Sequence, residues 1–333
     1  MLTALDIVWA LIVVFAVMMY VVMDGFDLGI GILFTRFTVG VERDTAMNSI
    51  APVWDGNETW LVLGGGGLMA AFPLAYAIVL PAMYAPLIAM LLGLVFRGVA
   101  FEFRWRDPAH RAWWDGAFCL GSLIATLGQG IVLGALLQGV HISGRAYAGG
   151  YWDWLTPFSL LTGASLIVGY ALLGACWLIW RTSSALQLRA RGLARHLCVA
   201  LLIAIGAVSL WTPFLRPKYF TIWFRGPGRI ATLLVPLAVG WLGWRLFRRA
   251  AEGRDVGPFL LTLSLFGLCF VGLGLSMWPE IIPGGLTIAA AAAPPQSQTF
   301  MLVGACLLLP LILGYTAWAY WVFRGKIADA GYH

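Results

Sequence analysis

The chain has 333 residues, of which 61% are hydrophobic and only 11% are charged, and its formal net charge is +6. Soluble domains average about 25% charged residues, so the composition excludes an ordinary soluble protein and predicts an all-α integral membrane protein. The basic residues fall in short segments between apolar runs, which is typical of a membrane protein and argues against nucleic-acid binding.

Nine apolar runs are long enough to cross a membrane as helices, since a span needs about 20 residues. They cover residues 7–34, 53–72, 77–103, 114–138, 157–180, 197–214, 230–247, 258–278 and 299–323. Their lack of alternation excludes a β-barrel. We expect one polytopic domain, 1–333, in which residues 1–138 form a first four-helix bundle and residues 157–333 form a second bundle plus one peripheral helix.

Lys and Arg concentrate after the first, third, fifth and seventh spans and at the C-terminus. The positive-inside rule therefore predicts a cytoplasmic C-terminus and an N-terminus on the outer side. The segment 215–229 breaks this bias with four basic residues on the outer side. It could pack on a partner or touch lipid headgroups, and the sequence leaves both open.

The first span carries two acids, Asp24 and Asp27, which share one helix face. Asp24 lies about ten residues before the end of the span, hence about 15 Å deep. A carboxylate at that depth costs a few kcal/mol unless it is protonated, paired or hydrated. We expect a role in proton movement or in tuning a buried site, with a structural ion pair as the alternative. Gly25 and Gly29 predict close approach of another helix.

The second span opens with Trp54, Asp55, Asn57 and Glu58. Asp55 and Glu58 are three residues apart and so lie on one helix face. An acid at a helix start is also an ordinary N-cap that complements the helix dipole. Capping does not require two acids and Asn57, so a water-filled mouth is the second interpretation. The glycine run 64–67 that follows lacks the Lys-Ser/Thr of a phosphate loop, and helix packing explains it better. Pro73 could join this span to 77–103 as one broken unit.

The third span ends with Arg97 and Glu102. We expect Arg97 to pair with Asp24, Asp27 or Glu102, or with an anionic group on a partner, while snorkelling to the interface is the alternative. Helical spacing puts Arg97 and Glu102 about 140° apart, which makes them poor partners within one helix.

No span interior offers a histidine, the usual axial ligand of haem, so we predict that this chain binds no haem. The sequence also lacks a metal-ligand cluster and a dinucleotide-binding fingerprint. The five cysteines occur singly and predict small buried hydrophobic residues. The histidines lie in loops or at the edge of a span, at positions 110, 141, 196 and 333.

Four motifs together resemble subunit II of the cytochrome bd-type ubiquinol oxidases. They lie at residues 24–29, 48–61, 96–104 and 315–321, and the similarity covers nearly the whole chain. The short length and compact middle loops resemble the cyanide-insensitive branch of the family.

The resemblance implies a bacterial inner-membrane complex that oxidises quinol and reduces oxygen to water with protons from the cytoplasm. Haems b and d would belong to subunit I, and this chain would be its haem-free, similarly folded partner. By position, Asp55 matches the family's proton-path aspartate at the subunit interface and Asp24 the acid further along that route. Trp54, Asp27, Asn57, Glu58, Arg97 and Glu102 are candidates for supporting roles.

The resemblance also allows a structural quinone in this subunit and a small single-helix accessory subunit. No residue of the sequence indicates where the quinone would bind. Two other functions stay open from the residues alone. One is a proton or cation antiporter that uses Asp24, Asp27 and Asp55, although inverted repeats and a midplane helix break are not visible. The other is a purely structural membrane subunit whose acids only neutralise Arg97.

Overall fold

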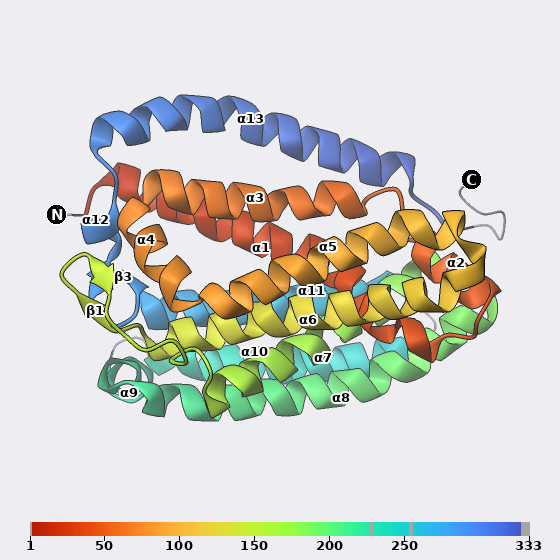
Figure 1. The fold of residues 1–333 in the computed structure, drawn as a ribbon. Helices are drawn as coiled ribbons and strands as arrows, with labels where there is room; N and C mark the ends of the chain where they lie inside the picture. Colours follow the sequence, from red (N-terminus) through yellow and green to blue (C-terminus); the bar gives the residue numbers. More distant parts are fainter. Residues whose placement is uncertain (1, 227–228, 253–255, 328–333) are drawn as a thin grey trace.

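The computed structural model describes residues 2–226, 229–252 and 256–327, without the side chains of 231–233, and it is a bundle of long helices (Figure 1). The helices are α1 (Ala4–Leu33), α2 (Val41–Asn48), α3 (Trp54–Ala71), α4 (Pro73–Ala82), α5 (Tyr84–Arg106), α6 (Arg111–Gln138), α7 (Pro157–Arg181), α8 (Ser184–Leu215), α9 (Pro217–Phe224), α10 (Arg229–Glu252), α11 (Gly257–Met277), α12 (Ile288–Ala291) and α13 (Pro295–Val322). Short antiparallel hairpins pair β1 (Ile142–Ser143) with β2 (Ala146–Tyr147) and β3 (Glu280–Ile282) with β4 (Leu286–Thr287).

The fold class predicted from composition is confirmed. Within the described residues, seven helices are long and apolar enough to cross a membrane, namely Ala4–Arg36, Tyr84–Arg106, Pro108–Gln138, Pro157–Arg181, Ser184–Leu215, Gly257–Met277 and Pro295–Val322. The two other predicted spans coincide with α3 and α10. The predicted division into two four-helix bundles stays a prediction, and α1 and α6 pack directly on α7.

The long helices run roughly parallel to one axis, so the molecule has two ends (Figure 1). We call the end that holds Ala4 the N end and the end that holds Val322 the C end. Because consecutive long helices reverse direction, α3 begins at the C end, beside the last turns of α1 and α5. Two parts of earlier predictions lie outside the described residues. They are residues 227–228, which belong to the basic segment 215–229, and His333.

Two predicted span boundaries were wrong. Residues 77–82 belong to α4, a separate short helix, and the next long helix begins only at Tyr84. The backbone leaves the helical region at Phe72, which precedes a proline, and Pro73 then starts α4. It leaves the helical region again at Met83, with φ −120° and ψ 26°, and this second break separates α4 from α5. The span predicted at 197–214 is the second half of α8, which begins at Ser184. Its basic first half stays helical because Leu, Ala, Gln and Arg are good helix formers and charges do not end a helix in water.

Close helix contacts in the core depend on glycine, as the sequence predicts. A Cβ at Gly29 of α1 would overlap the main-chain carbonyl of Tyr170 and crowd Gly174 of α7. In the glycine run of α3, Gly64 and Gly67 lie against valines of α1, whereas Gly65 and Gly66 have no other atom near their Cβ positions. Only part of that run therefore serves packing within this chain.

The basic segment 215–229, which breaks the positive-inside bias, packs on the N end of its own chain. Lys218 lies 3.1 Å from Glu280, and Tyr219 donates a 3.0 Å hydrogen bond to the Leu137 carbonyl at the end of α6. Arg216 binds the neighbouring Gln138 carbonyl. Free carbonyls at helix C-termini attract cations, which accounts for Arg216 at the end of α6 and for Lys218 at the end of α11, two of the four basic residues of this segment.

Candidate functional site

A fully buried arginine gathers three acids near the C end of the bundle. Arg97 Nη1 lies 2.9 Å from Asp24 Oδ1 and 2.6 Å from Glu58 Oε1. Its Nη2 lies 3.7 Å from Asp27 Oδ2. Asp24 and Asp27 have 0% exposure, and the side chain of Glu58 is 27% exposed. We call Asp24, Asp27, Glu58 and Arg97 the acid cluster.

Three helices place these side chains. Asp24 and Asp27 are one turn apart on α1, Glu58 is in the second turn of α3, and Arg97 is in the latter half of α5. Asp24 lies nine residues before the last residue of α1, or about 14 Å along the axis, close to the depth expected from sequence. A lone guanidinium or carboxylate at this depth is costly, so mutual pairing is what allows Asp24, Asp27 and Arg97 to be fully buried.

Asn57 completes the cluster from α3. Its Nδ2 donates to Asp27 Oδ2 at 2.7 Å and to the Met23 carbonyl at 3.2 Å. Its Oδ1 accepts a 2.9 Å hydrogen bond from the Tyr320 hydroxyl of α13. Trp54 lies flat on Phe101, with ring centroids 4.7 Å apart, and its ring also faces the Arg97 guanidinium. Asn57 therefore contacts the acids, and Trp54 covers the arginine.

Asp55 lies outside this buried set. It is exposed and shares one face of α3 with Thr59, Val62, Gly66 and Met69, which we call the outer face of α3. The N-cap of α3 is Val53 and carries no side-chain cap hydrogen bond, so Asp55 is not the cap residue that one interpretation proposed. Asp55 is nevertheless an electrostatic neighbour of Glu58, one turn further along the helix.

Glu102 does not pair with Arg97. Its side chain is 61% exposed and lies 3.4 Å from Arg106 on the surface of α5. The reason is the helical offset between positions 97 and 102, which turns Glu102 away from the bundle while Arg97 points inward. Glu102 therefore makes no contact with the acid cluster that would support its predicted role.

Sequence reasoning missed a polar chain that continues from the acid cluster toward the N end. Tyr20, one turn before Asp24, is an electrostatic neighbour of the Asp24 carboxyl. The Tyr20 hydroxyl accepts from Gln129 Nε2 at 2.7 Å, and the Tyr170 hydroxyl donates to Gln129 Oε1 at 2.8 Å. Only the spacing of Tyr20 and Asp24 was visible in sequence, because the other two residues lie on α6 and α7.

A second cluster of side-chain ion pairs lies at the C end of the bundle. Asp115 of α6 binds Arg104 of α5 and accepts a 2.7 Å hydrogen bond from Arg43 of the short helix α2. Arg104 also lies 2.9 Å from Asp44, which binds Arg111. Asp115 and Arg104 are buried. These pairs tie α2 to the α5–α6 hairpin and hold the surface beside the start of α3.

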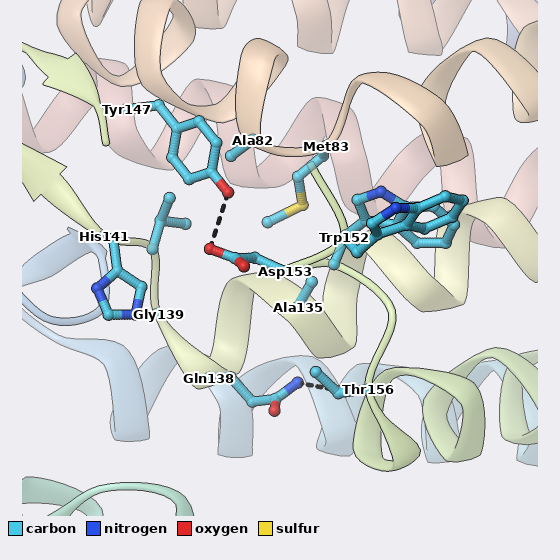
Figure 2. A pocket seen from close by; sticks show the side chains of 12 residues that line it. Ala82, Met83, Ala135, Gln138, Gly139, His141, Tyr147, Trp152, Asp153 and Thr156 are labelled. Carbon is cyan, nitrogen blue, oxygen red and sulfur yellow. Dashed lines mark hydrogen bonds between the residues drawn. The ribbon is translucent and has the colours of Figure 1, made fainter. Parts of the chain in front are cut away.

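A cavity of about 370 Å³ opens at the N end, between α4, the end of α6 and the loop before α7 (Figure 2). Asp153 lies in it and accepts hydrogen bonds from the Tyr147 hydroxyl, at 3.0 Å, and from Gly150 N. Burial and the Asp153 carboxylate raise the pKa of Tyr147 to about 12. This cavity contains none of the predicted site residues, and it lies at the opposite end of the bundle from the acid cluster.

Neither of two cavities among the described residues offers an evident place for the predicted quinone. Its ring would need a largely apolar slot. The cavity at Asp153 has a mixed polar lining, and a second, at the start of α1 and the segment before α13, is open and formed mostly by alanine and proline. Across the described ranges, no group of three or more His, Cys, Asp or Glu side chains could hold a metal ion. The cysteines at 119, 176 and 198 are buried as predicted, whereas Cys306 is exposed.

Membrane-crossing helices that enclose acids paired to one arginine define a polytopic membrane protein with an internal charged site. Comparison with known proteins identifies the family. The model of the family described as cytochrome bd terminal oxidase subunit II matches residues 5–323. The chain therefore belongs to the cytochrome bd terminal oxidase subunit II family, as its motifs indicate, and it is a subunit of an oxidoreductase complex.

Individual relatives agree over nearly their full length. Cytochrome bd-I ubiquinol oxidase subunit 2 of Escherichia coli (strain K12) is 30% identical over 361 residues, covering 97% of this chain and 95% of the relative. Cytochrome bd ubiquinol oxidase subunit 2 of Bacillus subtilis (strain 168) is 31% identical over 335 residues, covering 96% of each. A chain of the bd oxidase structure from Geobacillus thermodenitrificans has the same fold, with a TM-score of 0.76 at 17% identity, and the match covers 97% of this chain and 100% of that one.

Proposed function

We propose that this chain is the haem-free subunit of a quinol oxidase and delivers protons from the cytoplasm to oxygen chemistry in its partner, subunit I. The observation that carries the proposal is a graded series of acids. Asp55 is exposed, Glu58 is partly exposed and Asp24 is fully buried, and Arg97 Nη1 binds the last two within 3 Å. Reduction of oxygen consumes protons, and a series of ionisable groups is how a helical bundle conducts them inward.

The acids divide the transfer into short steps. Asp55 would take a proton at the surface and pass it toward Glu58, one turn away on the same helix. Arg97 stabilises negative charge on Glu58 and Asp24, so a proton can leave either acid without leaving an unpaired buried charge. Asp24 Oδ2 and Asp27 Oδ1 accept no hydrogen bond from the described residues, which gives each an oxygen able to bind a water molecule on the route.

The proposed direction follows from charge. The positive-inside pattern predicts a cytoplasmic C end, and the acid cluster lies in that half of the bundle. Protons taken from the cytoplasm while quinol releases protons outside would build a membrane potential. Each charge moved against it costs about 2.3 kcal/mol per 100 mV.

Support for a partner comes from the outer face of α3. Val62 is 74% exposed on it, and a Cβ at Gly66 would meet no atom of this chain. We infer that subunit I covers this face and so receives protons near Asp55 and Glu58. A single-helix accessory subunit and a structural quinone stay predictions.

The test uses the purified complex with Asp24→Asn, Asp55→Asn and the matched control Glu102→Gln. Each variant replaces one carboxylate of the C-end half by an isosteric amide. We expect normal haem content in all three. Quinol-oxidase turnover and proton uptake should fall about a hundredfold or more in the two path variants, the lower end of the usual contribution of a positioned proton-transfer group, and stay normal in Glu102→Gln.

Two results would contradict the proposal. Normal turnover and normal proton uptake in Asp24→Asn and Asp55→Asn would leave only the structural role of the acid cluster. A preparation that contains no haem-bearing partner and exchanges protons for another cation would instead favour the antiporter.

A further inference from the structure

The last long helix, α13, lies along the outside of the bundle and is fastened to it near both ends (Figure 1). At the N end, Gln298 binds Asp6 at 2.8 Å, and its main-chain carbonyl accepts from Trp9 Nε1 at 3.1 Å. Near the C end, Tyr320 reaches Asn57, and Arg181 of α7 binds the Phe323 carbonyl. Tyr320 belongs to the closing motif at 315–321, to which the proposed proton route assigns no role.

The Tyr320 hydroxyl and the Met23 carbonyl together fix the orientation of the Asn57 amide, the first as a donor to Oδ1 and the second as an acceptor from Nδ2. A carboxamide has one accepting oxygen and one donating nitrogen, so a donor on one side determines what faces the other. Because Tyr320 donates to Oδ1 at 2.9 Å, Nδ2 faces α1 and donates to Asp27 Oδ2 at 2.7 Å. Asn57 is 1% exposed, so water cannot readily substitute for these partners.

We propose that Tyr320 is a positioning residue that acts through Asn57 to hold Asp27 as a hydrogen-bonded carboxylate beside Arg97. This inference rests on the proposed proton route and extends it to α13. An N–H donor favours the ionised form of the carboxyl it binds, whereas an amide oxygen facing the same carboxyl favours the protonated form. Arg97 lies 3.7 Å from Asp27 and 2.9 Å from Asp24, so Asp27 depends more on Asn57 than Asp24 does.

The other groups around Asp27 are fixed by separate contacts. Asp24 on α1, Glu58 on α3 and Arg97 on α5 are its charged neighbours. On the α7 side, Tyr320 packs near the uncharged Trp177, with ring centroids 6.1 Å apart, and the charge of Arg181 acts on Tyr320. Removing the Tyr320 hydroxyl therefore takes away the donor that holds Asn57 Oδ1, and so loosens the amide that binds Asp27, without removing a charge from the cluster.

The experiment measures the pH dependence of quinol-oxidase turnover and of proton uptake in the intact complex carrying Tyr320→Phe. The matched control is Tyr315→Phe, which deletes the same hydroxyl from an exposed position on the same helix. We expect the midpoint of the alkaline limb in Tyr320→Phe to move up by about half a pH unit or more, since a hydrogen bond to a charged group contributes about 1.5–3 kcal/mol and only part of it is lost. The KM for quinol and the haem content should not change, and Tyr315→Phe should match the unmodified complex.

The outcomes separate this inference from the proposed function. An unchanged pH profile in Tyr320→Phe, next to impaired turnover in Asp24→Asn, would overturn the role of Tyr320 alone. Normal turnover in Asp24→Asn would overturn the proton route and the role of Tyr320 with it. If Tyr320→Phe does not assemble, Asn57→Ala removes the same donor from Asp27, and an unshifted profile in that variant also contradicts the inference.

Discussion

Arg97 and Asp24 are 73 residues apart in the chain, yet Nη1 of the arginine lies 2.9 Å from Oδ1 of the aspartate. Both side chains have 0% exposure. The same nitrogen binds Glu58, which connects this buried pair to the partly exposed start of α3. One arginine therefore supports both the packing of three helices and the proposed proton route.

Replacing Arg97 should be the most destabilising single change in the acid cluster. Arg97→Leu would leave up to three carboxylates without their cation, and breaking a buried ion pair costs about 3–5 kcal/mol. Chemical denaturation of the complex in detergent measures the effect. Arg106→Leu is the control, because Arg106 is 77% exposed and a surface pair contributes about 0–1 kcal/mol. Equal stability of the two variants would show that the buried pairs do not hold the helices together.

Gly29→Ala should separate α1 from α7. The added methyl would overlap the Tyr170 carbonyl, which belongs to a rigid helix backbone, and overpacking of this kind costs about 1–3 kcal/mol or more. Gly206→Ala on α8 is the control, since its methyl would meet no atom within 4 Å. The yield of haem-containing complex and its thermal midpoint report the difference. A wild-type midpoint in Gly29→Ala would contradict the close approach of these helices.

Asp115→Ala should loosen α2 from the C end. The substitution leaves Arg104 and Arg43 without a shared acid, although Arg104 keeps Asp44 at 2.9 Å. We expect a loss of about 2 kcal/mol and faster proteolysis between residues 38 and 48. The control is Asp107→Ala, which removes an acid that binds His110 at the same end. Unchanged proteolysis in Asp115→Ala would mean that the cluster does not hold α2.

The Lys218–Glu280 pair should give the N end a measurable pH dependence. Burial of the Glu280 carboxyl opposes ionisation, but the Gly284 N–H and the Lys218 ammonium outweigh it and lower the pKa of Glu280 below its ordinary value of 4.5. Since the folded-state pKa is lowered, the contribution to stability is complete above pH 4.5 and disappears as the pH falls through the lowered pKa.

At neutral pH the thermal midpoint of the unmodified complex should therefore exceed that of Glu280→Gln, and the corresponding difference in stability is less than about 1 kcal/mol. The two midpoints should converge in acid. Lys218→Met should reduce the difference, because it removes the cation that lowers the pKa. A difference that grows as the pH falls would contradict the assignment.

The sequence by itself determined the fold class, most helix positions, the family and the distance of Asp24 from the end of its helix. Each follows from local information, since hydrophobic runs report burial in a membrane and a rise of 1.5 Å per residue converts position into depth. The same periodicity indicated that Arg97 and Glu102 are poor partners. It misplaced the starts of α5 and α8, because a break at Met83 and a helical basic segment are decided by backbone geometry at single residues.

Only the tertiary structure decided which side chains meet. Helical spacing gives the face of a residue but not the helix opposite that face, so it could not choose among the partners of Arg97, bring Tyr320 of α13 to Asn57, or link Tyr20 to Gln129 and Tyr170. These contacts join segments between 39 and 263 residues apart. Buried polar groups must find partners in a medium without water, and the packing of the whole bundle determines which partners are within reach.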